Sequence, residues 1–363
     1  MVGRLVLLLQ QTMLVSALHL SPGHASVLAR RASAATRAPV LAACTDAAPR
    51  WFDPLQEFGL DEPRSDPKLL PLLLILPGAD GSGITAWMQY PSLAQDFELR
   101  ALTIPSGDRS SHAELVELVT REVIEASAST GGEREIFLLG ESMGTGVAID
   151  VALALENSSA GPSAPELAGL LLVSPATAWF RKGSYQVLTW RDSVLTSGRG
   201  PWPVLLQLLL TLSSYELLDA AQVTGTFRRL LTGERSPLLA GEARTSYAWR
   251  VVSELPARLA LDPATASHRK GWAEPTFAAG RRVSELRVPV LCVAGTADLR
   301  VPAADEARRF EREVRSCRAV YVEGAGHAGA TDDRLDLRAE LAAWRRDVVM
   351  PNQESRDSSL VSA

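Results

Sequence analysis

Cysteine is scarce in this 363-residue chain, which contains only Cys44, Cys292 and Cys317. Their number is odd and they form no CxxC pair, so the sequence predicts neither a zinc site nor a disulfide framework. We expect buried thiols instead, and neither a metal nor a cofactor. A strong positive charge is also missing, because the formal net charge is -5 and no basic stripe is present. This balance argues against a nucleic-acid-binding protein.

Long apolar runs are missing as well. After residue 50, no segment reaches 18 consecutive apolar residues, so we expect no membrane-spanning helix. The composition, 46% hydrophobic and 22% charged, is ordinary for a packed globular protein. The length leaves room for one large domain or two small ones.

Acidic residues are absent from the first 45 positions. Leu5–Leu20 is a short apolar region broken by polar residues, and Gly23–Ala25 fits a small-x-small cleavage site. Residues 26–44 are rich in Arg, Ala and Ser, as organelle transit peptides are. The two features in series predict that residues 1–45 form a bipartite presequence for a plastid reached through the secretory route. An ordinary secretory leader followed by a disordered linker is the alternative.

Six short apolar runs recur along the rest of the chain. None alternates strictly between apolar and polar residues, which is typical of strands buried on both faces of a parallel sheet. Helical patterns separate them, and one of these begins with a capping box formed by Ser111 and Glu114. This order predicts an α/β fold, a mostly parallel, doubly wound sheet with right-handed crossovers. The runs are Leu72–Gly78, Leu99–Pro105, Glu135–Gly140, Leu170–Pro175, Pro289–Gly295 and Ala319–Gly324.

The alternation of strands and helices breaks after Pro175, where about 110 residues show helix-like apolar stretches but no clear strand. We therefore expect one domain over residues 46–350, with an inserted helical cap at about 176–287. The strongly apolar stretch Pro201–Ala221 is either a lid helix over an apolar pocket or part of the packing inside the insertion. Residues 351–363 have the composition of a disordered tail.

The stretch Ile136–Leu153 (IFLLGESMGTGVAIDVAL) places Ser142 in a G-x-S-x-G motif between a predicted strand and a helix. A serine hydroxyl becomes an effective nucleophile only when a base takes its proton and its oxygen stands clear of the backbone. A sharp strand-to-helix turn meets the second need, and Gly140 and Gly144 flank the bend where a Cβ would collide with its neighbours. We therefore predict Ser142 as the nucleophile and the backbone N–H of Met143 as one oxyanion donor.

A general base and an orienting acid should follow Ser142 in the chain, with the acid first. Of the five histidines, His327 is the one on a glycine-rich loop directly after the last predicted strand, so we predict it as the base. Asp298 follows the strand before that and is predicted to hold the imidazole in the right tautomer. Asp332 and Asp333 lie just past His327 and are the rival acids.

A second glycine-rich loop, LPGADGSG, starts at Leu76 after the first predicted strand. Its glycine spacing, G-x-x-G-x-G, does not match the dinucleotide fingerprint, and no lysine follows as in a phosphate-binding loop. The position suits the second half of an oxyanion hole instead. We predict that the backbone N–H of Ala79, with that of Asp80 as the alternative, donates the second hydrogen bond.

These motifs resemble the α/β-hydrolase superfamily and, more narrowly, the plastid esterase/lipase/thioesterase group that includes the phytyl ester synthases, also described as diacylglycerol acyltransferases. The resemblance rests on PRWFDPL from Pro49, LPGADGSG, IFLLGESMGTGVA, LLLVSPATAW and the block from VAGTADLRVP to EGAGH, and covers most of residues 49–340. It implies the α/β-hydrolase fold, a triad of Ser142, Asp298 and His327, and acyl transfer to phytol or diacylglycerol. Members of that group usually carry a second, acyltransferase-like domain after the hydrolase unit. Whether the acyl group passes to water or to a lipid alcohol stays open.

Together these observations predict a serine hydrolase or O-acyltransferase that acts on lipid-like acyl esters. We expect no nucleic-acid partner, and peripheral membrane contact through the cap. A serine aminopeptidase of the same fold is one alternative, with Glu216, Asp219 or Glu242 binding the substrate amine. A non-catalytic hydrolase-like binding protein is the other, although such a protein has no need of nucleophile, acid and base in the correct order.

Overall fold

The computed structural model describes residues 48–60, 70–158, 165–179, 237–239, 241–259, 263–298, 300–327, 330, 332–351 and 353. The predicted presequence, Cys44, the stretch Pro201–Ala221 and nearly all of the predicted tail lie outside these residues. Cys292 is a buried free thiol, as predicted, whereas Cys317 is only half-buried. Within the described residues, no helix has the length and apolar character needed to cross a membrane.

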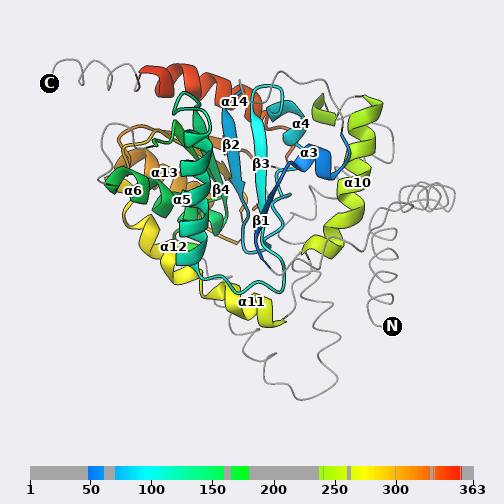
Figure 1. Cartoon of the computed structure of the whole chain (residues 1–363), viewed down its shortest axis with the longest axis horizontal. Helices are drawn as coiled ribbons and strands as arrows, with labels where there is room; N and C mark the ends of the chain where they lie inside the picture. Colours follow the sequence, from blue (N-terminus) through cyan, green and yellow to red (C-terminus); the bar gives the residue numbers. More distant parts are fainter. Residues whose placement is uncertain are drawn as a thin grey trace.

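A seven-stranded sheet in the order β1-β3-β2-β4-β5-β6-β7 forms the frame of the molecule (Figure 1). All neighbouring strands are parallel except β1, which pairs antiparallel with β3. Each of the six predicted runs forms a strand, and the predicted α/β fold is confirmed. The strands are β1 (Arg50–Phe52), β2 (Leu72–Leu76), β3 (Glu98–Thr103), β4 (Ile136–Glu141), β5 (Gly169–Val173), β6 (Val290–Gly295) and β7 (Cys317–Val322).

Helices cover both faces of the sheet (Figure 1). One core lies under α3, α4, α10 and α14, and the other under α5, α6, α12 and α13. Their bounds are α3 (Pro54–Glu57), α4 (Tyr90–Leu93), α5 (His112–Ala128), α6 (Gly144–Asn157), α10 (Glu242–Leu259), α11 (Pro263–Lys270), α12 (Ala273–Gly280), α13 (Ala303–Glu313) and α14 (Leu337–Trp344). Short 3₁₀ turns span Pro237–Leu239 and Val283–Glu285, and a π-helical turn, Arg345–Val349, continues α14.

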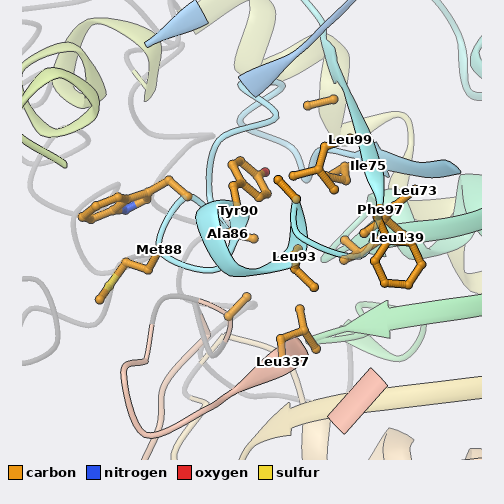
Figure 2. Close-up of a cluster of buried hydrophobic side chains, with 14 of the residues drawn as sticks. Leu73, Ile75, Ala86, Met88, Tyr90, Leu93, Phe97, Leu99, Leu139 and Leu337 are labelled. Carbon is orange, nitrogen blue, oxygen red and sulfur yellow. The ribbon is translucent and has the colours of Figure 1, made fainter. Parts of the chain in front are cut away.

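Both faces of the four central strands, β2, β4, β5 and β6, are buried, which explains why their sequences do not alternate in polarity. Alternate residues of β2 enter the two cores, Leu73 and Ile75 on one side and Leu72, Leu74 and Leu76 on the other. Figure 2 shows the first of these cores, where Tyr90 and Leu93 of α4 lie among side chains of the strands and Leu337 of α14. The predicted capping box also forms, because the Ser111 hydroxyl accepts the Glu114 N–H and the Glu114 carboxylate accepts the Ser111 N–H.

The segment between β5 and β6 contains α10, α11 and α12 and no strand within its described residues. The sheet is nevertheless continuous across it, because Leu170 pairs with Val290 and Val173 pairs with Val293. The two ends of the predicted insertion are therefore brought together by neighbouring strands. Its exact limits stay a prediction.

The strand order reverses at β2, and this reversal positions the candidate site. After β2 the chain runs through α4 on one face of the sheet, whereas after β4 it runs through α6 on the other face. In an open parallel sheet, a crevice forms between the carboxyl ends of two such strands, and ligands bind there. The loop 77–83 after β2 and the turn at Ser142 after β4 both lie at this point.

Candidate active site

Ser142 lies on a strained turn between β4 and α6. Its φ is 52°, a left-handed conformation that costs a non-glycine residue about 1–3 kcal/mol and is common at active sites. The turn is held in place because the Ser142 N–H donates a 2.9 Å hydrogen bond to the carbonyl of Val173 at the end of β5. The strained backbone thus sets the serine side chain apart at the carboxyl edge of the sheet.

Close backbone contacts explain the two glycines of the G-x-S-x-G motif. A Cβ on Gly140 would lie 2.6 Å from the carbonyl oxygen of Gly144 and 2.9 Å from the Cβ of Ala148 in α6. A Cβ on Gly144 would lie 2.4 Å from the carbonyl oxygen of Pro77, in the loop after β2. Side chains at either position would therefore force α6 away from β4 or from that loop.

The structure brings the three predicted triad side chains into one hydrogen-bonded chain. His327 Nε2 lies 2.9 Å from Ser142 Oγ, and His327 Nδ1 lies 2.8 Å from Asp298 Oδ2. Asp298 comes from the loop after β6 and His327 from the loop after β7, so three separate strand ends contribute. The imidazole is buried, with an exposed fraction of only 6%.

The carboxylate of Asp298 is held in its charged form. Burial acts to raise its pKa, but the charge of His327 and the hydrogen bonds from His327 and from two backbone amides outweigh this, so the pKa lies below the ordinary value. Those amides belong to Arg300 and Val301, whose N–H groups donate to Asp298 Oδ1 over 2.8 and 3.1 Å. Oδ1 is thus occupied by the backbone, and Oδ2 faces the imidazole.

The rival acid Asp332 pairs with Arg334 instead of His327. Its carboxylate accepts hydrogen bonds from the side chain and the backbone N–H of Arg334. Its backbone carbonyl accepts from the amide of Gln89 on the neighbouring loop. The structure therefore pairs His327 with Asp298, the acid chosen from its place at a strand end, rather than with Asp332.

The predicted oxyanion donors lie beside Ser142. A Cβ built on Gly78 would be 3.0 Å from Ser142 Cβ, so the loop after β2 lies directly against Ser142. Within the described part of the chain, the backbone N–H groups of Met143, Ala79 and Asp80 have no hydrogen-bond acceptor. Unpaired N–H groups next to a nucleophile are what a developing oxyanion needs.

Ser174 is a residue that the sequence reasoning missed. It follows β5 and has a φ of 47°, and it is the second non-glycine residue with a positive φ among those described. Its fully buried hydroxyl donates a 2.5 Å hydrogen bond to the backbone carbonyl of His327. This contact anchors the histidine loop to the sheet. The sequence feature that could have identified Ser174 is its place at the end of a predicted strand, in the run LLLVSP.

Glu141, the residue directly before Ser142, was also not predicted from the sequence. Burial and, to a smaller extent, the negative charge of Asp80 raise the pKa of the Glu141 carboxyl well above its ordinary value. The hydroxyl of Thr85 donates a hydrogen bond to this carboxyl. The shift favours the neutral acid, so Glu141 adds little negative charge beside the place where an oxyanion would form.

The remaining site predictions are only partly covered by the structure. Glu242 is exposed in the first turn of α10, while Glu216 and Asp219 lie outside the described residues. In the described ranges, no group of three or more His, Cys, Asp or Glu side chains is placed to hold a metal ion.

Comparison with known proteins places the chain among hydrolase-fold proteins. No family model matches it. Phytyl ester synthase 1, chloroplastic, of Arabidopsis thaliana is 26% identical over 319 residues, which cover 83% of this chain and 41% of the relative. Phytyl ester synthase 2, chloroplastic, of the same organism is 37% identical over 129 residues, 36% of this chain and 16% of the relative. The chain thus spans less than half the length of these curated relatives.

A solved structure supports the same fold. The α/β hydrolase enzyme MGS-M2, from a Medee basin deep-sea metagenome library, is similar with a TM-score of 0.50 and 12% identity. The similarity covers 83% of this chain and 94% of that one. By its sheet and these similarities, the chain has the α/β-hydrolase fold and resembles the phytyl ester synthases.

Proposed function

We propose that the protein is a serine-dependent acyl-ester hydrolase or acyltransferase that acts on lipid-like esters. The observation that carries the proposal is the chain of two hydrogen bonds from Asp298 through His327 to Ser142. A non-catalytic binding protein has no use for a strained serine aligned with a buried imidazole that pairs with a carboxylate. The same geometry serves ester hydrolysis and acyl transfer alike.

The distances are compatible with the following proton transfers. Nδ1–H of His327 donates to Asp298, so Nε2 is free to accept the proton of the Ser142 hydroxyl as Oγ attacks the ester carbonyl carbon. The tetrahedral intermediate collapses to acyl-Ser142, and the imidazolium gives its proton to the departing alcohol. In the second half-reaction, Nε2 takes a proton from water or from an acceptor alcohol, which attacks the acyl carbon, and then returns this proton to Oγ of Ser142.

The oxyanion role of the Ala79 N–H has a direct test in Ala79→Pro. Proline removes that N–H and is well tolerated at the second position of a β-turn, where Ala79 lies. Loss of one oxyanion donor should lower kcat by about 10²- to 10³-fold, measured with p-nitrophenyl butyrate. Ala79→Ser keeps the N–H and serves as the control. Unchanged kcat in Ala79→Pro would assign the donor role to Asp80 instead.

The substrate class is proposed from the relatives. Both curated relatives are named phytyl ester synthases and chloroplastic. We therefore place this protein in the plastid, in agreement with the predicted presequence, and take phytol as the first acceptor alcohol to test.

Mass spectrometry of the reaction products tests the proposed function. We expect purified protein incubated with plastid lipid extract to release fatty acids, and to form fatty-acid phytyl esters in addition when free phytol is supplied. Ser142→Ala is the control for both products, since it lacks the nucleophile. Fatty acids without phytyl esters would identify a hydrolase. Product levels equal to those of Ser142→Ala under both conditions would contradict the proposal.

A further inference from the structure

Arg269 is a buried cation in the segment between β5 and β6. It belongs to α11, at the edge of the molecule in Figure 1, yet its exposed fraction is 1%. Its Nη1 donates to the carbonyl of Ala79 over 2.9 Å, and Nη2 donates to those of Ile104 and Pro105 over 2.7 and 3.0 Å. The guanidinium also lies 5.4 Å from the ring centroid of Trp272. A buried charge requires such partners, and these are backbone groups of the loops after β2 and β3.

The carbonyl that Arg269 holds belongs to the middle peptide of a β-turn. The Gly81 N–H donates to the Gly78 carbonyl over 3.0 Å, so Ala79 and Asp80 are the two central residues. Neither of them has a positive φ, which excludes types II, I′ and II′, and the hydrogen-bonded turn fits type I. In this type the central residues have helix-like dihedral angles, and the N–H groups of Ala79 and Asp80 point to one side while the Ala79 carbonyl points to the other.

Type I and type II turns differ by a flip of that middle peptide. The flip would turn the carbonyl oxygen of Ala79 to the side on which the two N–H groups now lie, and there its negative charge would repel the predicted oxyanion. Arg269 binds the Ala79 oxygen in the unflipped orientation, through a charge-assisted hydrogen bond. The same bond polarises the peptide and makes its N–H a stronger donor.

From this geometry we infer that Arg269 is a positioning residue for the oxyanion hole, which connects the inserted segment to the chemistry at Ser142. The inference rests on the proposed function. The fit is close, because a Cβ on Gly81 would lie 2.4 Å from Arg269 Nη1. Docking of α11 therefore both covers the loop after β2 and fixes the direction of its donors.

Arg269→Met, Arg269→Lys and Thr265→Val form the test set. Thr265 is a buried residue of α11 whose hydroxyl donates to the Ser106 carbonyl, so its replacement weakens the docking of the helix without touching Ala79. The readouts are kcat and KM for p-nitrophenyl butyrate, the inhibition constant of phenylboronic acid, whose tetrahedral adduct with Ser142 occupies the oxyanion hole, and the melting temperature.

We expect Arg269→Met to lower kcat by about 10- to 100-fold, less than the loss of a donor itself, with little change in KM. The affinity for the boronate should fall by the same factor as kcat. Arg269→Lys should recover part of both, because one ammonium donor can still reach the Ala79 carbonyl. Thr265→Val should keep kcat and boronate affinity close to the wild type even where its melting temperature falls.

Three results would overturn the inference. The first is wild-type kcat in Arg269→Met. The second is a loss of kcat with unchanged boronate affinity, and the third is an equal loss in Thr265→Val, which would indicate packing alone. If Arg269→Met does not fold, kcat and boronate affinity of Arg269→Lys test the inference in its place. A wild-type protein that neither hydrolyses the ester nor binds the boronate would refute the proposed function, and this inference with it.

Discussion

Replacing Ser142 with alanine should lower kcat for p-nitrophenyl butyrate by about 10⁵- to 10⁶-fold, the loss seen when the nucleophile of a triad is removed. The effect is large because His327 and Asp298 act through the serine oxygen. Without it, the imidazole at 2.9 Å has no proton to accept and no acyl-enzyme can form. The same variant should lose all labelling by a fluorophosphonate probe.

The control for this variant is Ser127→Ala, the same chemical change in α5 on one face of the sheet. It should keep wild-type turnover and labelling. The melting temperature of Ser142→Ala should stay near that of the wild type, because alanine also has a Cβ in the left-handed turn and the backbone bond to Val173 is kept. Wild-type turnover in Ser142→Ala would remove Ser142 from the mechanism.

Asp298→Asn should lower kcat by about 10⁴-fold, the effect of a wrong imidazole tautomer. The structure shows why an amide cannot substitute. Two backbone N–H groups donate to Oδ1, so an asparagine must keep its oxygen there and turn its NH₂ group toward His327. Nδ1 would then have to accept, the proton would move to Nε2, and Nε2 could no longer take the proton of Ser142.

Asp332→Asn is the matched control for Asp298→Asn, since Asp332 is an equally buried carboxylate near the histidine loop that pairs with Arg334. It should change stability more than kcat. Comparing kcat of the two variants, each corrected for its folded fraction, shows which carboxylate orients His327. An equal or greater loss of kcat in Asp332→Asn would show that the orienting acid was assigned wrongly.

The sheet was predictable because its four central strands are buried on both faces. A run such as Leu72–Leu76 has no polar residue to confuse its assignment, and the flanking glycines and prolines mark its ends. The strand β1 was not predicted. It has three residues and pairs only along one edge, so its sequence, Arg50–Phe52, has no period long enough to detect.

The parts of the candidate site that could be predicted are those whose position follows from the order of the strands along the chain. Ser142, Asp298 and His327 each follow a strand, and strand ends meet at one edge of a parallel sheet. Ser174 also follows a strand, but its contact with the histidine loop was not predictable from chain order, and neither was the contact of Arg269 with the loop after β2. Both side chains donate hydrogen bonds to backbone carbonyls of distant loops. Because every residue has a backbone carbonyl, the sequence does not show which one accepts such a bond.

The direct pairing of β5 with β6 has a consequence for how proteins of this fold can vary. The sheet already brings both ends of the intervening segment to adjacent strands, so doubling the length of that segment adds only about 0.6 kcal/mol of loop-closure entropy. Inserted segments of different length can therefore be exchanged on one sheet at a small thermodynamic penalty. If Arg269 acts as inferred, such an exchange preserves activity only when the new segment still places a cation at the turn of Ala79.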